Sequence, residues 1–253
     1  MAEIGAPSRP RALVTGGAAG LGKAFVELLL ARGYDVVSVD RASPERSNAL
    51  SIECDLADRV ELDRNIGVIV AGGPYQVVIL NAGVSATGKF GAMPLDAYRR
   101  LTAVNVEAPL VLASSLVRAG AVCGHICFVS SLSHFTGYPG AAVYAASKDA
   151  LAVYARSVRR PFAKRGVTVT VAFPGPMRTA HAARHAPVSS SEKLRTDPAH
   201  AAHRILKATL AGRSVAFSDA RSRLIATAGG LLPTVMTRAM RRMIFEKLET
   251  EVW

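Results

Sequence analysis

The stretch "RALVTGGAAGLG", residues 11–22, decides the fold of this chain. Its first five residues form a short apolar strand signal, and a glycine-rich segment then leads into a helical pattern over about 21–32. Gly16, Gly20 and Gly22 are spaced G-x-x-x-G-x-G. Glycines let the chain turn tightly and bring backbone N–H groups close to an anion, toward which the following helix directs its positive end. The stretch therefore predicts a strand, a phosphate-binding turn and a helix.

The same alternation of strand and helix continues to about residue 218. Further strands are expected at 35–40, 77–80, 125–131, 167–173 and 214–218, and helices at about 58–70, 94–119, 145–164 and 198–211. Apolar strands that alternate with helices form βαβ units. We therefore expect the α/β class: a doubly wound parallel sheet, or Rossmann fold, in a single domain with a C-terminal helical tail. Residues 1–218 would form the main domain and 219–253 the extension.

Two local features interrupt this pattern. Pro161 stands where a helix should be running, and it should kink or end that helix near Arg160. The polar segment 180–197 predicts a long loop after a strand, and such loops often act as mobile lids over a site.

Composition limits the classes of function. The chain has 253 residues, of which half are hydrophobic and one fifth are charged, as in one globular domain with ample material for a core. The formal net charge of +12 attracts nucleic acid, anionic membranes or anionic ligands. The basic residues are scattered, however, and aromatic residues make up only 6%, which argues against specific nucleic-acid binding.

Cysteine and histidine usage points to a reducing compartment and to no metal site. The three cysteines fit neither a disulfide framework nor a C-x-x-C motif. They are Cys54, Cys123 and Cys127. Two histidine pairs at helical spacing have no third ligand, so we interpret them as solvated residues. They are His181/His185 and His200/His203. The N-terminal segment has no secretory apolar core, and we expect a cytoplasmic protein.

The end of the second strand bears on the choice of cofactor. Asp40 lies eighteen residues after Gly22, where a carboxylate can accept both hydroxyls of an adenosine ribose and repel a 2′-phosphate. This favours NAD(H) over NADP(H). The neighbouring Arg41 could neutralise a 2′-phosphate, and a solvated turn is a further alternative. Asp55 and Leu56 follow another strand end, where the adenine would lie.

A tyrosine and a lysine four residues apart occur in "VYAASKDAL", residues 143–151. On a helix, this spacing places Tyr144 and Lys148 on one face. Taken alone, the pair is either a surface contact or a device for proton transfer. A nearby lysine cation stabilises a phenolate, and so lowers a pKa that is about 10 in free tyrosine.

With these residues in place, the chain resembles the short-chain dehydrogenase/reductase family from about residue 10 to 218. The matching motifs occur in the family's order and near its spacing. They are "TGGAAGLG" (15–22), Asp55–Leu56, "LNAG" (80–83), Asn105, Ser131 thirteen residues before Tyr144, "YAASK" (144–148) and "PGPMRT" (174–179). The chain departs from the family at Leu80, where the family has an asparagine.

The resemblance implies an NAD(P)-dependent oxidoreductase that acts on a secondary alcohol or ketone. Tyr144 would be the general acid/base, Lys148 would also hold the nicotinamide ribose, and Ser131 would orient the substrate oxygen. Asn105 would hold a water that links Lys148 to solvent. The expected cofactor-binding residues are Thr15, Gly16, Gly20, Leu21, Gly22, Asp40, Arg41, Asp55, Leu56, Asn81, Ala82, Gly83, Tyr144, Lys148, Pro174, Gly175, Met177 and Thr179.

Each of these assignments has a plainer alternative. Ser130 and Ser133 compete with Ser131, Asn105 could bridge backbone groups, and Thr179 could cap a helix. We expect Tyr154 to pack in the protein interior. His134 could line the substrate pocket or lie in a loop. The whole chain could be a non-catalytic Rossmann sensor or scaffold, although a sensor has no need of the Ser–Tyr–Lys set.

The expected partners follow from the same reading. We expect a small-molecule substrate, with lipophilic carbonyl or alcohol compounds among the candidates, and a homodimer or homotetramer formed through helices 94–119 and 145–164. In the tail, apolar residues recur at helical spacing after Pro233, opposite a group of arginines. The tail could cover the substrate pocket or a partner subunit, lie on an anionic membrane, or dock loosely.

Overall fold

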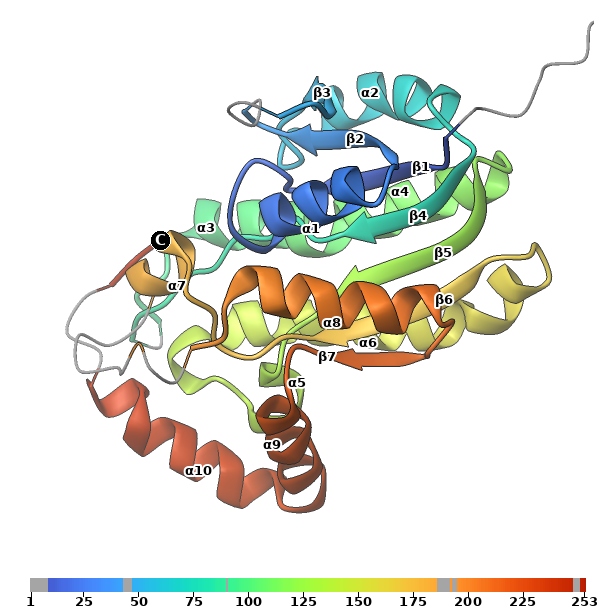
Figure 1. Cartoon of the computed structure of the whole chain (residues 1–253). Helices are drawn as coiled ribbons and strands as arrows, with labels where there is room; N and C mark the ends of the chain where they lie inside the picture. The colour runs from blue at the N-terminus through green and yellow to red at the C-terminus, as the bar shows by residue number, and fades with distance from the viewer. Residues whose placement is uncertain (1–8, 43–46, 90, 186–191, 193–194, 248–250) are drawn as a thin grey trace, which may run out of the picture.

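The computed structural model describes residues 9–42, 47–89, 91–185, 192, 195–247 and 251–253. Its centre is a seven-stranded parallel sheet in the order β3-β2-β1-β4-β5-β6-β7 (Figure 1). The strands are β1 Arg11–Thr15, β2 Asp35–Asp40, β3 Leu50–Glu53, β4 Tyr75–Leu80, β5 Val122–Val129, β6 Thr168–Phe173 and β7 Val215–Phe217. The predicted fold class, a doubly wound parallel sheet in a single domain with a helical tail, is confirmed.

Helices cover both faces of the sheet. One face carries α1 (Gly20–Ala31) and α8 (Pro198–Leu210), which also pack on each other (Figure 1). The opposite face carries α2 (Arg59–Ala71), α4 (Ala108–Arg118) and α6 (Ala142–Ala163). Two buried clusters of side chains, one for each face, make up the core.

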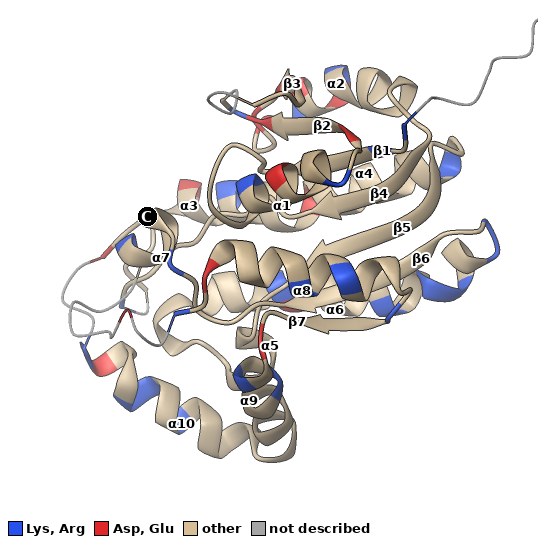
Figure 2. Cartoon of the chain, in the orientation of Figure 1, with Lys and Arg blue, Asp and Glu red and all other residues tan. Residues whose placement is uncertain are grey.

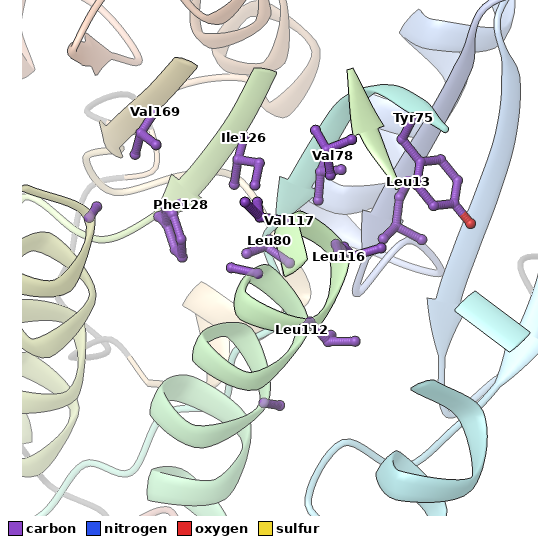
Figure 3. Close-up of a cluster of buried hydrophobic side chains, with 14 of the residues drawn as sticks. Leu13, Tyr75, Val78, Leu80, Leu112, Leu116, Val117, Ile126, Phe128 and Val169 are labelled. Carbon is purple, nitrogen blue, oxygen red and sulfur yellow. The ribbon is translucent and has the colours of Figure 1, made fainter. Parts of the chain in front are cut away.

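The strands supply alternate residues to these two clusters. In β4, Val77 and Ile79 face the α1–α8 layer, whereas Val78 and Leu80 face the α2–α4–α6 layer. Figure 3 shows the second cluster, in which Phe128 and Leu80 lie beside side chains of α4. Because both faces are buried, the strands read as continuous apolar runs rather than as alternating ones.

Two helices differ from their predictions. Pro161 does not end α6 at Arg160, because the helix continues to Ala163 and buries Phe162 in the core. The missing N–H of the proline falls in the last turn, where it costs one hydrogen bond and not the whole helix. The stretch expected as one helix at 94–119 is α3 (Leu95–Thr102) and α4, joined by a π-helical turn at Ala103–Glu107.

Among the described residues, Leu95–Arg118 is the one helical stretch long and apolar enough to cross a membrane. Half of its most apolar window is buried inside the protein, and its α4 part packs on β5 and α6. This is the burial of a core helix in a globular domain.

The tail forms two helices, α9 (Ala220–Leu231) and α10 (Pro233–Met243), which stand beside the sheet below β7 (Figure 1). Both pack on α5 (Ser133–Thr136), the short helix after β5. Segment 180–197 contains the short helix α7 (Ala180–Arg184). Most of the rest of the predicted loop lies outside the described residues.

The glycine turn gives a test of the fold. A Cβ on Gly22 would lie 1.8 Å from the carbonyl oxygen of Gly16, whereas nothing lies within 4 Å of a Cβ on Gly67 in α2. Gly22→Ala should therefore lower the free energy of unfolding by about 1–3 kcal/mol, the usual cost of overpacking. Gly67→Ala should raise it by up to about 1 kcal/mol through helix propensity. Chemical denaturation measures both, and equal stability of the two variants would contradict the turn geometry.

Candidate active site

The expected site residues gather at the carboxyl edge of the sheet, where the strand order reverses between β1 and β4. The Thr15 hydroxyl accepts hydrogen bonds from the backbone N–H groups of Asn81 (3.0 Å) and Ala82 (3.1 Å). The Asn81 amide donates back to the carbonyl oxygens of Thr15 and Gly16 at 3.2 and 3.3 Å. These bonds fix the glycine turn to the end of β4.

The glycine turn itself is tightly packed and left-handed at two positions. Gly16 has φ of 71° and Gly20 has φ of 55°, values that only glycine adopts readily. A Cβ on Gly16 would lie 2.8 Å from the Cα of Ala82. The turn leads directly into α1, so the helix directs its N-terminal end at the space above the turn.

Asp40 lies at the end of β2 beside this turn. One carboxylate oxygen accepts from the Ala18 N–H at 2.9 Å, and the other accepts from the Arg41 N–H at 2.7 Å. The negative charge is thus held next to the turn. Further along the edge, Asp55 accepts from the Ala57 N–H at 2.9 Å and pairs with a guanidinium group of α3.

Leu80 packs into the core with 1% of its surface exposed. The side chain that departs from the family motif thus points into the apolar layer under α4, and the three residues after it form the rim of the site.

Tyr144 and Lys148 lie in the first two turns of α6, with the ammonium nitrogen 5.9 Å from the centre of the phenol ring. Lys148 is 4% exposed and donates to the carbonyl oxygen of Val129 at 3.0 Å. The ammonium group borders the rim at Gly83, where a Cβ would lie 2.9 Å from Nζ. Glycine at 83 therefore leaves the space that the ammonium group occupies.

Burial moves the pKa values of this pair in opposite directions from their ordinary values. It lowers the pKa of Lys148 to about 8, because a desolvated ammonium is costly. It raises the pKa of Tyr144, and a hydrogen bond with the Ser131 side chain lowers that pKa in part. The phenol is therefore neutral at pH 7, and the ammonium group of Lys148 titrates at about pH 8.

The three serines after β5 have separate surroundings. Ser131 contacts Tyr144 through its side chain. Ser130 is buried and donates to the carbonyl oxygen of Lys148 at 2.8 Å, so it holds α6. Ser133 is buried in α5, and its backbone N–H donates to the Ser131 hydroxyl at 3.2 Å. Of these three serines, Ser131 is the one whose side chain bonds to Tyr144.

Asn105 lies in the π-helical turn and is fully buried. Its amide pairs with both backbone groups of Val84, accepting from N–H at 2.8 Å and donating to the carbonyl at 2.9 Å. It also donates to the Ser147 hydroxyl at 2.9 Å. The side chain thus bridges the rim to α6, the alternative left open by the sequence, and it does so beside Lys148.

Segment 174–179 connects β6 to α7. The carbonyl oxygen of Pro174 accepts from the Leu132 N–H at 2.9 Å, and the Gly175 N–H donates to Ser218 at 3.1 Å. Thr179 caps α7 by accepting from the Ala182 N–H at 3.1 Å, the capping role left open by the sequence. Its methyl group would lie 3.3 Å from a Cβ on Gly20. The segment therefore reaches the glycine turn.

Helix α7 brings two histidines to this site, and the interpretation of them as solvated residues is wrong. Their ring centres lie 4.8 Å apart, and His185 is buried with its Nδ1 3.0 Å from the Thr87 hydroxyl. Burial lowers the pKa of His181 to about 4, with contributions from His185 and from Lys148. His181 is therefore a neutral imidazole within electrostatic range of the Lys148 ammonium. Only the lid prediction for 180–197 hinted at this placement.

His134 and Tyr154, for which the sequence left other roles open, both pack against aromatic rings. His134 stacks on Phe173 and lies 2.8 Å from an Asp149 carboxylate oxygen, so it packs rather than lying free in a loop. Tyr154 packs edge-on against Phe128, as predicted. A separate open hollow of about 670 Å³ lies beside α3, and none of the proposed catalytic residues line it.

Residues 10–188 match the profile of the family described as short chain dehydrogenase. The chain belongs to the short-chain dehydrogenase/reductase family. As a member of this family, it is an NAD(P)-dependent oxidoreductase.

Two relatives and one solved structure illustrate the range of this family. The 3-oxoacyl-[acyl-carrier-protein] reductase MabA of Mycobacterium tuberculosis is 32% identical over 166 residues, which cover 64% of this chain and 67% of the relative. The cyclic-di-GMP-binding biofilm dispersal mediator protein of Escherichia coli is 30% identical over 181 residues, which cover 70% and 76%. A short chain dehydrogenase from Burkholderia cenocepacia in complex with NADP is 23% identical, with a TM-score of 0.77 and coverage of 93% and 97%.

The buried ammonium group of Lys148 gives a test by pH. Because Lys148 has a pKa of about 8 when folded and about 10.5 when unfolded, the unfolded chain binds more protons between these values. Lys148→Met should therefore be more stable than wild type at pH 7, by on the order of 2 kcal/mol. This advantage should shrink as the pH rises from about 8 to 10.5.

Denaturant unfolding at several pH values measures this difference. Lys23→Met is the matched control, since Lys23 is half exposed on α1. Because this variant removes an exposed ammonium group and not a buried one, it should not be more stable than wild type at pH 7. A wild type more stable than Lys148→Met at pH 7, or a difference that is constant with pH, would contradict a destabilised buried charge.

Proposed function

We propose that this dehydrogenase transfers a hydride between a nicotinamide cofactor and a secondary alcohol or ketone, with Tyr144 as the general acid/base. The observation that carries the proposal is the meeting of Tyr144, Lys148 and Ser131 beside a glycine turn that opens a helix. A proton donor, a cation and a hydroxyl are the groups that carbonyl reduction needs, and a phosphate turn next to them is where a dinucleotide binds.

The bound cofactor supplies the hydride, and the protein handles the proton. In reduction, the neutral phenol of Tyr144 donates its proton to the substrate oxygen as the carbonyl carbon receives the hydride. The Ser131 hydroxyl donates a hydrogen bond to the same oxygen and stabilises its developing charge. The Lys148 ammonium stabilises the phenolate that remains. In oxidation, the same groups act in reverse.

Asn105 enters this proposal as a positioning residue. Its amide is committed to Val84 and Ser147, and it lies next to Gly83, which also borders Lys148. We propose that a water held at this turn reprotonates Tyr144 through Lys148, with Asn105 fixing the geometry of the turn.

The cofactor would lie along the carboxyl edge of the sheet, from the adenine end at β3 to the nicotinamide end beside α6. The proposed contacts are those predicted from the sequence: Thr15, Gly16, Gly20, Leu21, Gly22, Asp40, Arg41, Asp55, Leu56, Asn81, Ala82, Gly83, Tyr144, Lys148, Pro174, Gly175, Met177 and Thr179. We add His181 as a residue on the substrate side, because Lys148 is among the charges that lower the pKa of its imidazole.

We propose NAD(H) over NADP(H) because the Asp40 carboxylate is held beside the turn, where it would repel a 2′-phosphate. The Burkholderia structure was solved with NADP, which points the other way. At 23% identity, the similarity to the Burkholderia structure concerns the fold alone. The proposal for NAD(H) therefore rests on the charge of Asp40 in this chain.

The substrate class follows from the chemistry of the site and from relatives. A ketone reduced to a secondary alcohol suits the Tyr144–Ser131 pair, and the MabA relative is named for reducing a 3-oxoacyl group. We propose a small, lipophilic carbonyl or alcohol compound as the substrate.

We also propose a homodimer or homotetramer that forms through α4 and α6. We propose a cytoplasmic location, with which the free thiols of Cys54, Cys123 and Cys127 are compatible.

A second candidate is a nucleotide sensor without catalysis. The Escherichia coli relative is named for binding cyclic di-GMP, and it shares most of this chain's length. A sensor would keep the glycine turn but would not depend on the phenol of Tyr144, so a substitution at that phenol separates the two candidates.

Tyr144→Phe should bind NADH as wild type does and lower turnover by about 10²–10⁴-fold, because it removes the transferred proton. Ser131→Ala should lower turnover by about 10²–10³-fold, since one donor to the reacting oxygen is lost. Ser130→Ala is the matched control, because it should reduce stability by about 1 kcal/mol and largely keep turnover.

A screen of ketones and alcohols with both cofactors supplies the assay, and NADH fluorescence measures binding. Full turnover in Tyr144→Phe would overturn the proposed chemistry. Nucleotide binding without turnover of any compound in wild type would favour the sensor.

The cofactor preference is tested at Asp40. Asp40→Asn keeps an oxygen that accepts from Ala18 and removes the charge, so it should shift the NADH-to-NADPH affinity ratio by at least about tenfold toward NADPH. Asp35→Asn, at the exposed start of the same strand, should leave the ratio unchanged. Fluorescence titration measures both ratios, and equal affinity of wild type for the two cofactors would remove the assigned role.

A further inference from the structure

Helix α9 and the bend that joins it to α10 expose a group of large apolar side chains. Leu231 is 76% exposed, Leu232 58% and Val235 55%, and Leu224 on α9 is 71% exposed. We call these four residues the apolar elbow. Four exposed side chains of this size on one short hairpin are unusual at a surface that faces only water. The structure therefore presents an apolar tip on the C-terminal extension.

Basic residues flank this elbow. Between residues 220 and 247, the chain has six Lys or Arg residues and one Glu. Figure 2 shows blue bands at the start of α9 and along α10, with one red segment near the far end of α10. On α10, Val235, Arg238 and Arg242 follow i, i+3, i+7 spacing and so share one helix face. Apolar and cationic groups therefore point outward together.

The other face of the hairpin is docked on the protein. The Thr237 hydroxyl donates to the Thr136 carbonyl at 3.2 Å, and a Cβ on Gly229 would lie 2.3 Å from the Phe135 carbonyl oxygen. At the start of α9, the Asp219 carboxylate accepts from Ser222 and from Thr196. The elbow is thus held out from the body by a fixed base, so it is not a loose appendage.

We propose that the apolar elbow and its arginines dock this protein onto the surface of an anionic phospholipid membrane. The apolar side chains would enter the boundary between headgroups and acyl chains, and the arginines would contact phosphates. Long arginine side chains reach the headgroups even when their helix lies at the apolar level.

Charge decides between this partner and a second copy of the same chain. Two elbows brought together would each carry an excess of positive charge, and like charges at such a contact repel. An anionic membrane has an apolar layer that can accept the apolar side chains and negative headgroups that can bind the arginines. The base of the hairpin lies on α5, which begins two residues after Ser131, so docking would fix the orientation of the proposed substrate site relative to the membrane.

Vesicle co-sedimentation of the full chain tests the proposal without any activity assay. Vesicles of 30% phosphatidylglycerol in phosphatidylcholine should bind the wild type at least tenfold more tightly than pure phosphatidylcholine at low salt. Two double variants, Leu231→Asp/Leu232→Asp and Arg238→Glu/Arg242→Glu, should each lose at least tenfold in that binding.

Matched controls carry the same changes elsewhere on the surface. Leu50→Asp/Val60→Asp replaces two exposed apolar residues at β3 and α2, and Arg32→Glu/Arg64→Glu reverses two exposed charges. Both should bind the vesicles within a fewfold of the wild type.

Failure of the wild type to bind anionic vesicles would overturn the proposal, and so would elbow variants that bind as well as their controls. A change of oligomeric state in Leu231→Asp/Leu232→Asp, measured by light scattering, would assign the elbow to a second copy instead. Circular dichroism and NADH binding show whether the variants are folded, so that loss of docking is separated from loss of the cofactor site.

Discussion

The rest of the site depends on how β1 and β4 part at the carboxyl edge of the sheet. Parallel strands wound in two directions leave a crevice where the order reverses, and backbone groups at that edge need partners. Thr15 and Asn81 supply them across the crevice at 3.0–3.3 Å. This lock fixes the glycine turn on one side and the rim at Gly83 on the other, so the space for a dinucleotide is set by sheet topology.

The rim then determines where the cation can lie. Asn105 holds Val84 from a π-helical turn, and Gly83 leaves room for the ammonium of Lys148. The protein keeps this charge buried although burial lowers its pKa to about 8, which is a cost to stability. Such a cost is common at sites whose chemistry needs a shifted titration. The same burial leaves Tyr144 neutral until a second positive charge approaches it.

The sequence allowed the fold class and the place of the glycine turn to be predicted, because both follow from short-range patterns of apolar and glycine residues. Spacing also favours Ser131 over Ser130 as the proposed catalytic serine, and the two serines have different partners in the structure. The continuation of α6 past Pro161 could not be predicted from the sequence, because burial of Phe162 outweighs one lost hydrogen bond. The position of His181 could not be predicted either. It depends on how α7 packs against segments that are far apart from it in the chain. The exposure of the elbow likewise depends on which face of the tail the body covers.

The central claim is that the crevice places a cation beside the phenol of Tyr144 so that this phenol can exchange a proton. Ultraviolet difference titration of tyrosinate in the complex with NAD⁺ tests it without knowledge of the substrate. We expect one tyrosine in the complex to ionise well below the ordinary pKa of about 10, and we expect this signal to be absent from Tyr144→Phe. A complex in which no tyrosine ionises below that value, or in which the low-pKa signal persists in Tyr144→Phe, would contradict it.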